Sequence, residues 1–146
     1  MRSITDQVEI KTDAQSVFNA LITPSAIQKW WNAQTAMVLP KVDGFWAATW
    51  GENLDDPDYI VAAMIREFES PWKLVLTDYL YHSKDFAPPT GYDPTTEYRI
   101  SPSPSGSLLT VIQSGFPNSP ESEKFFQGCL TGWQATRQGI KDFLER

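Results

Sequence analysis

The last quarter of the chain carries one long helical pattern, and this pattern constrains the fold more than any other feature. Ser119 suits a helix N-cap, Pro120 suits the first helical position, and Glu121 and Glu123 favour the positive end of a helix. Apolar side chains then recur at helical spacing: Phe126, Cys129, Leu130, Trp133, Ile140, Phe143 and Leu144. Arg137 interrupts this stripe. We expect a helix from about residue 120 to the end, with an apolar face that must be covered.

Most of the chain before this helix alternates between apolar and polar residues, which is typical of β-strands. The pattern predicts strands at residues 3–11, 35–39, 44–50, 59–69, 72–79, 95–101 and 107–115. Short Gly- and Pro-containing turns separate consecutive strands, so we expect an antiparallel sheet. The stretch 81–94 is a long loop with three prolines and three aromatic residues, and loops of this kind in small domains are usually functional or mobile.

Two short helices are expected between the first and second strands. Residues 12–15 (TDAQ) are typical of a capping box, and the helix that follows ends near Thr23. Pro24 suits the first turn of a second helix, whose apolar face includes Trp30 and Trp31. The prediction is therefore an α+β fold in a single domain, residues 1–146: about six to seven antiparallel strands, curved around one long C-terminal helix.

Composition narrows the classes of function. The net charge of −6 argues against nucleic acid or an anionic membrane surface as a partner. Cys129 is the one cysteine, so no internal disulfide and no zinc cluster can form. The first residues show no apolar signal-peptide region, and a cytoplasmic location is expected.

Six short segments resemble one protein family in both content and order. They are 13–21 (DAQSVFNAL), the Trp30-Trp31 pair, 43–46 (DGFW), 70–77 (SPWKLVLT), 109–116 (LTVIQSGF) and the Gly132-Trp133 pair. They are spread along the chain from residue 13 to residue 133. The chain resembles the START-like (helix-grip, SRPBCC) superfamily, in the branch named after the C-terminal domain of the activator of heat-shock-protein-90 ATPase.

The resemblance implies a cavity between the concave face of the sheet and the long helix. It also implies which strand residues face that cavity: Trp46, Ala48 and Trp50; Leu74, Leu76 and Asp78; Thr96, Tyr98 and Ile100; Leu109, Val111 and Gln113. Side chains two residues apart on a strand face the same side, so the members of each set should share one face, although a single bulge would turn part of a set outward.

Two positions depart from the family pattern: Asp78, in one of these strand sets, replaces an aromatic residue, and Arg137, on the long helix, replaces an apolar one. One hypothesis is that Asp78 and Arg137, with Tyr98 and Gln113, form the polar end of a ligand pocket. Its aromatic walls would be Trp31, Trp46, Trp50, Phe126 and Trp133. The alternative is that both charged residues lie at the rim and reach water, and that the tryptophans are ordinary core.

A search for catalytic motifs finds no established set of residues. His82 is the single histidine, and it and Asp78 are the weak candidates for an acid or base; a solvated His82 is the simpler interpretation. We interpret Cys129 as a small buried hydrophobe. Asp55, Asp56 and Asp58 lack calcium-loop spacing and fit a solvated turn. No metal site and no cofactor is expected.

Three functions stay open. The first is binding of a small apolar, aromatic or amphipathic molecule in the cavity, without catalysis. The second is an enzyme of the cyclase, dehydratase or hydrolase kind found in related folds. The third is a co-chaperone-like interaction domain, which is disfavoured because no companion segment such as the eukaryotic activators carry is present. A homodimer is left open, and neither nucleic acid nor a membrane is expected as a partner.

Overall fold

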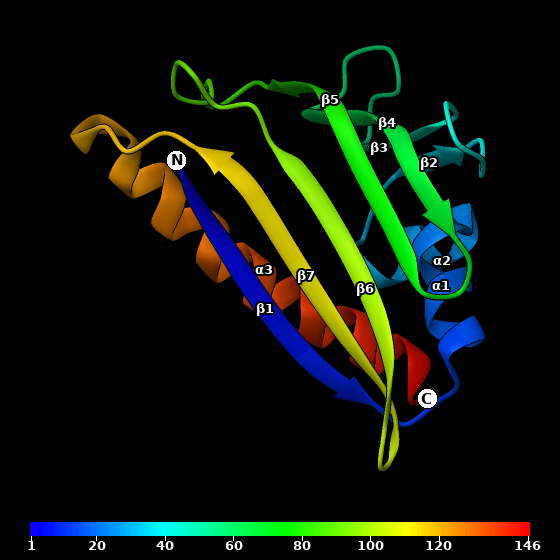
Figure 1. The fold of residues 1–146 in the computed structure, drawn as a ribbon. Helices are drawn as coiled ribbons and strands as arrows, with labels where there is room; N and C mark the ends of the chain where they lie inside the picture. Colours follow the sequence, from blue (N-terminus) through cyan, green and yellow to red (C-terminus); the bar gives the residue numbers. More distant parts are fainter.

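Seven strands form one antiparallel sheet, in the order β1-β7-β6-β5-β4-β3-β2 (Figure 1). The computed structural model describes residues 1–146. The strands are β1 (Arg2–Ile10), β2 (Thr35–Val38), β3 (Phe45–Trp50), β4 (Tyr59–Glu69), β5 (Lys73–Ser83), β6 (Thr95–Ser103) and β7 (Gly106–Phe116). The helices are α1 (Ala14–Ile22), α2 (Pro24–Trp30), the short 3-10 turn η1 (Pro120–Ser122) and α3 (Glu123–Leu144). The predicted α+β helix-grip fold is confirmed.

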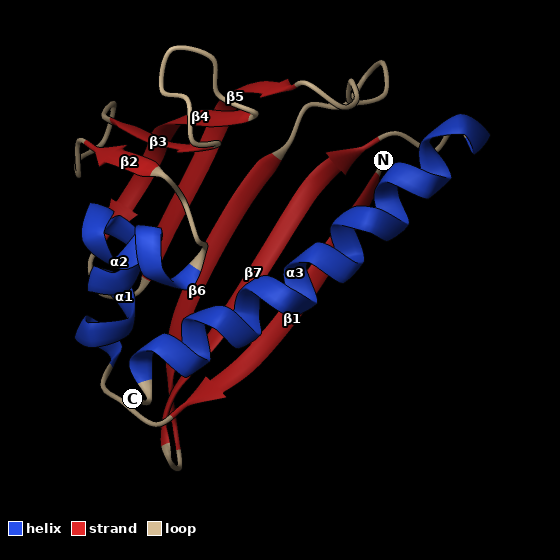
Figure 2. Cartoon of the chain, turned by 180° about the vertical axis from the view of Figure 1, so that it is seen from behind, coloured by secondary structure: helices blue, strands red, loops and turns tan.

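The long helix lies across one face of the curved sheet. In Figures 1 and 2, α3 runs along β1 and β7, while α1 and α2 sit beside its C-terminal end. The core lies between these helices and the sheet, and residues such as Phe18, Leu74, Leu109 and Ile140 are completely or almost completely buried there. None of the helices combines the length and the apolar character needed to cross a membrane.

The helix ends differ in detail from the prediction. The N-cap of α1 is Asp13, one residue later than a capping box would place it, and its carboxylate accepts a hydrogen bond from the Ser16 amide at 3.1 Å. Ser119 is the N-cap of η1, yet its side chain makes no capping hydrogen bond. The main helix therefore begins after a single 3-10 turn, at Glu123.

The two middle strands of the sheet pair over only part of their length. β5 pairs with β6 from Lys73 to Leu76, and beyond Leu76 the two strands diverge. Residues 84–94 span the resulting gap, and the Asp93 amide attaches this loop to the Gly115 carbonyl at 3.2 Å. Gly115 permits the close approach, since a Cβ there would lie 1.9 Å from the Asp93 oxygen.

A β-bulge interrupts β5 where the strands diverge. Thr77 pairs with Met64, but Leu80 pairs with Ala62, so β5 has one more residue than β4 between these pairs. Asp78 lies in this interval with a φ of +54°, in the left-handed region. Because side chains alternate along a strand, the extra residue reverses which face each later residue of β5 presents.

Candidate functional site

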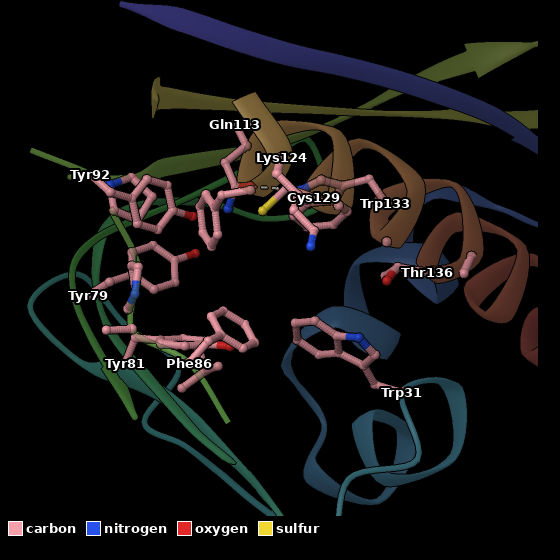
Figure 3. Close-up of a pocket in the computed structure, with 18 of the residues that line it drawn as sticks. Trp31, Tyr79, Tyr81, Phe86, Tyr92, Gln113, Lys124, Cys129, Trp133 and Thr136 are labelled. Atoms are coloured by element: carbon pink, nitrogen blue, oxygen red, sulfur yellow. Dashed lines mark hydrogen bonds between the residues drawn. The ribbon is translucent and has the colours of Figure 1, made fainter. Parts of the chain in front are cut away.

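A cavity of about 1190 Å³ lies between α3, α2, the strands β4 to β7 and the loop 84–94. Its lining is mostly apolar and aromatic. Figure 3 shows Tyr79, Tyr81 and Tyr92 on one side of an open space, with Trp133 and Thr136 on the side of α3. Trp31 faces this space from the end of α2. The volume is somewhat above the usual range for small-molecule sites.

Aromatic side chains from the loop and from α3 surround the outer part of the cavity. The Phe86 ring centroid lies 6.1 Å from that of Tyr81 and 6.3 Å from that of Phe125. Tyr92 packs edge-on against Phe125, with centroids 4.8 Å apart. The loop 84–94 therefore contributes to the wall, and Phe86, Ala87, Pro88, Tyr92 and Pro94 all line it.

A group of four tryptophans supports the opposite end. Trp31 stacks on Trp30 at 5.3 Å and meets Trp50 edge-on at 5.2 Å, and both Trp30 and Trp31 line the cavity. Trp46 and Trp50 lie behind them. The Trp46 indole donates a hydrogen bond to the Leu21 carbonyl at 3.0 Å, and that of Trp50 donates to the Trp31 carbonyl at 3.1 Å.

A chain of hydrogen bonds crosses the buried wall of the cavity. The Trp133 indole donates to Gln113 Oε1 at 2.8 Å, and Gln113 Nε2 donates to Thr96 Oγ1 at 3.0 Å. The Tyr79 hydroxyl donates to the same Thr96 oxygen at 2.7 Å. These polar groups are satisfied within the protein, which makes their burial energetically acceptable and holds α3 in register with the sheet.

Burial keeps the titratable groups of this wall neutral. It raises the pKa of the Tyr79, Tyr92 and Tyr98 hydroxyls above their usual range, because the phenolate would be poorly solvated. It also raises the pKa of the Cys129 thiol to about 11. The cavity therefore offers neutral hydrogen-bond donors, and no activated thiolate at neutral pH.

Four of the nine predicted ligand-binding residues line this cavity: Trp31, Tyr98, Gln113 and Trp133. The other five lie outside it. Trp46 and Trp50 support its wall from behind, as described above. Phe126 packs on Phe116 at 5.1 Å and beneath the Arg2 guanidinium at 3.9 Å, while its neighbour Phe125 takes the lining position.

The prediction that Asp78 and Arg137 share the cavity is wrong. The bulge turns Asp78 outward, where it is exposed and its carboxylate accepts a hydrogen bond from the Thr77 hydroxyl. Arg137 points toward β1, where it donates to the Gln7 carbonyl at 3.0 Å and pairs with Asp6 at 3.2 Å. The register expected for Leu74, Leu76 and the other three strand sets holds, since all of those residues are buried or partly buried.

The weak catalytic candidates do not meet in a site. His82 is exposed on β5 and, like Asp78, does not line the cavity. Asp56 and Asp58 pair with Lys84 at 2.8 and 3.4 Å, in agreement with a solvated turn. No group of three or more potential metal ligands occurs in the structure. Cys129 is partly buried, as interpreted, but it also lines the cavity.

The sequence does not identify the lining residues that follow the bulge in β5, and it identifies those of the loop 84–94 only through composition. Tyr79 and Tyr81 belong to the face of β5 that strict alternation would turn to solvent, and no signal in the sequence marks the bulge. Phe86 and Tyr92 lie in the loop whose length and aromatic content indicate a functional segment. The aromatic content of this loop is the sequence feature that points to Phe86 and Tyr92 as lining residues.

Comparison with known proteins identifies a family that the chain resembles over most of its length. Residues 11–145 match the family model described as Activator of Hsp90 ATPase homolog 1-like protein. No curated protein matches the chain significantly.

Solved structures share the fold at low sequence identity. A protein from Mesorhizobium loti has a TM-score of 0.78 at 19% identity, with 99% of this chain and 98% of that one covered. The solution structure of the Aha1 dimer from Colwellia psychrerythraea has a TM-score of 0.75 at 15% identity, with coverages of 99% and 97%. An AHSA1-like protein from Aeromonas hydrophila has a TM-score of 0.73 at 14% identity, with coverages of 99% and 92%. At these identities the likeness shows a shared fold.

Proposed function

This chain belongs to the family of Activator of Hsp90 ATPase homolog 1-like proteins, and from that premise we propose that it binds a small, partly apolar molecule in the cavity beside α3. The observation that carries the proposal is the cavity itself, about 1190 Å³ in volume with a mostly aromatic and apolar lining. Small-molecule sites have this composition, with a few polar groups that orient the ligand. A space of this size, left unfilled, forgoes the contacts that a packed core would make.

The chemistry of the lining supports binding over turnover. Its side chains include neither histidine nor aspartate, and its one carboxylate, Glu121, is exposed. The tyrosines and Cys129 stay protonated at neutral pH, because burial raises their pKa values. General acid–base catalysis works best with groups whose pKa values lie near the working pH. The proposed role is sequestration or sensing of the ligand.

A thermal-shift screen tests this function. Purified protein is melted with small aromatic acids, fatty acids, phenols and aromatic ketones. A ligand that binds the folded state stabilises it by about 2.7 kcal/mol at a hundredfold excess over its dissociation constant. Mass spectrometry of each compound after incubation detects any conversion, which would favour an enzyme.

Two leucine variants link any shift to the cavity. Gly132→Leu places a side chain on the cavity face of α3, whereas Gln134→Leu adds the same side chain at an exposed position that does not line it. We expect Gly132→Leu to abolish the thermal shift and Gln134→Leu to retain it. Asp78→Ala and Arg137→Leu should also retain it, since neither residue lines the cavity. A screen with no hit, or hits that survive in Gly132→Leu, would contradict the proposal.

A further inference from the structure

One buried hydroxyl group in the cavity wall has no partner. Tyr98 is only 4% exposed, yet its hydroxyl takes part in none of the side-chain hydrogen bonds, unlike that of Tyr79. The buried side-chain nitrogens and oxygens that are both unbonded and inaccessible belong to Arg2, Asp6 and Ser103, so the Tyr98 oxygen is not sealed in the core. It is a cavity-lining group, and burial favours its protonated form. A ligand that displaces water from this donor loses affinity unless it supplies an acceptor of its own.

Full charges are confined to the outer part of the cavity. Glu121 and Lys124 are the lining side chains that carry charge at neutral pH, and both are exposed near the start of α3. Trp133, whose ring centroid lies 6.1 Å from that of Tyr98, and Gln113 are neutral. A carboxylate that accepted a hydrogen bond from Tyr98 would lose its hydration without gaining a cation. A neutral acceptor, such as a carbonyl oxygen, meets no such cost.

The helix wall of the cavity is unusually bare. Gly128 and Gly132 lie one turn apart on α3 and both line the cavity. A Cβ at either position would find nothing within 4 Å, so close packing does not require glycine there. Glycine inside a helix is unfavourable relative to alanine. What these two residues provide is access to the helix backbone over a flat surface, next to the Cys129 side chain.

On the premise that the cavity binds a small molecule, we propose that its ligand is neutral and flat, with an acceptor oxygen that receives a hydrogen bond from Tyr98 and a ring system that lies against α3 at Gly128 and Gly132. The aromatic groups around the space in Figure 3, among them Trp31 and Phe86, then contact its faces and edges. Planar aromatic ketones and lactones belong to this class, whereas fatty acids and aromatic carboxylates do not.

Three probes that share a naphthalene ring system test separately the effect of the acceptor oxygen and the effect of its charge. 2-Acetylnaphthalene carries a neutral acceptor, 2-naphthoate carries a charged one, and 2-ethylnaphthalene carries none. Binding to the full chain is measured by equilibrium dialysis at neutral pH. We expect the ketone to bind most tightly, by about tenfold over 2-naphthoate, because only the carboxylate must be desolvated without a counter-charge.

Two tyrosine variants then isolate the hydroxyl group. Tyr98→Phe should weaken ketone binding by about three- to tenfold and leave 2-ethylnaphthalene unchanged, which corresponds to the net contribution of one hydrogen bond. Tyr79→Phe is the matched control, because its hydroxyl already donates to Thr96, and it should leave the ratio of ketone to hydrocarbon affinity unchanged. If Tyr98→Phe does not fold, the comparison of the three probes on the wild-type protein still decides the matter.

The outcomes distinguish this inference from the proposed function. If 2-naphthoate binds as tightly as the ketone, or if the ketone fails while other compounds in the wider screen bind, the inference is overturned and the binding function stands. Equal effects of Tyr98→Phe and Tyr79→Phe on the affinity ratio also overturn it. If no compound in either set binds, the proposed function fails, and the inference fails with it.

Discussion

The indole nitrogen of Trp133 on α3 donates a 2.8 Å hydrogen bond to the side-chain oxygen of Gln113 on β7, and both residues are buried. This bond connects the long helix to β7, the neighbour of edge strand β1, at the cavity wall. Gln113→Leu removes it and leaves the indole donor without a partner, so we expect the free energy of unfolding to fall by about 1–3 kcal/mol. Urea denaturation followed by circular dichroism measures this change.

Gln7→Leu serves as the control, because Gln7 is exposed on β1 and its side chain bonds only to the hydroxyl of half-buried Thr110. Its stability should change by less than about 0.5 kcal/mol. Equal effects of the two substitutions would mean that water in the cavity replaces Gln113, and that the connection does not stabilise the fold.

Two glycines of α3 should respond to alanine in opposite directions. Gly132 has open space where a Cβ would lie, so Gly132→Ala should stabilise the protein by about 0.5–1 kcal/mol through helix propensity alone. A Cβ at Gly139 would lie 2.6 Å from the Trp30 carbonyl oxygen, which is backbone and cannot rotate away. Gly139→Ala should therefore destabilise the contact between α2 and α3. Melting temperatures of the two variants test this, and a shift in the same direction for both would refute the geometry.

The reactivity of Cys129 should reveal its burial. Alkylating reagents attack the thiolate, and burial raises the pKa of this thiol to about 11. The alkylation rate of the folded protein should thus rise about tenfold per pH unit from neutral pH until it approaches the pKa. In urea the same cysteine should level off near its ordinary pKa, about 8.5. A plateau near pH 8.5 in the folded protein would show that Cys129 is freely solvated.

The backbone at Asp78 should tolerate glycine better than a branched residue. Its φ of +54° lies in the left-handed region, which costs a residue with a Cβ about 1–2 kcal/mol and β-branched residues most. Asp78→Gly should maintain or raise the free energy of unfolding, whereas Asp78→Val should lower it by about 1–2 kcal/mol. Leu80→Val, at an exposed position of the same strand, is the control. If Asp78→Val were as stable as Leu80→Val, the left-handed conformation would not be required.

The fold could be predicted from the sequence because each helix and strand has a strong local pattern of apolar and polar residues. The helical stripe from Phe126 to Leu144 and the alternation in residues 59–69 come from burial on one face of an element, and such patterns survive without knowledge of the neighbouring strands. The bounds of β4 were predicted to the residue.

The residues of the site could be predicted from the sequence only in part, because which residues line the cavity depends on how neighbouring strands pair. Tyr98 and Gln113 follow the alternation of fully paired strands and were found, whereas Tyr79 and Tyr81 follow a bulge that depends on how β4 and β5 pair. Arg137 was assigned to the cavity because of its place on the helix stripe. Helical spacing alone does not separate the edge of the stripe that faces β1 from the edge that faces the gap between β5 and β6.

The extra residue in β5 has a consequence for how this protein is compared with its relatives. If Asp78 were a regular strand residue instead of part of a bulge, strict alternation would direct Leu80 and His82 toward α3 and would turn Tyr79 and Tyr81 to solvent. The phenol groups of the cavity thus depend on the backbone conformation at a residue that does not line it. A relative that had the same residues here but paired them without a bulge would present an imidazole where this chain presents phenols. An alignment that omits the one-residue gap against relatives without the bulge will exchange lining residues for surface residues throughout this half of the strand.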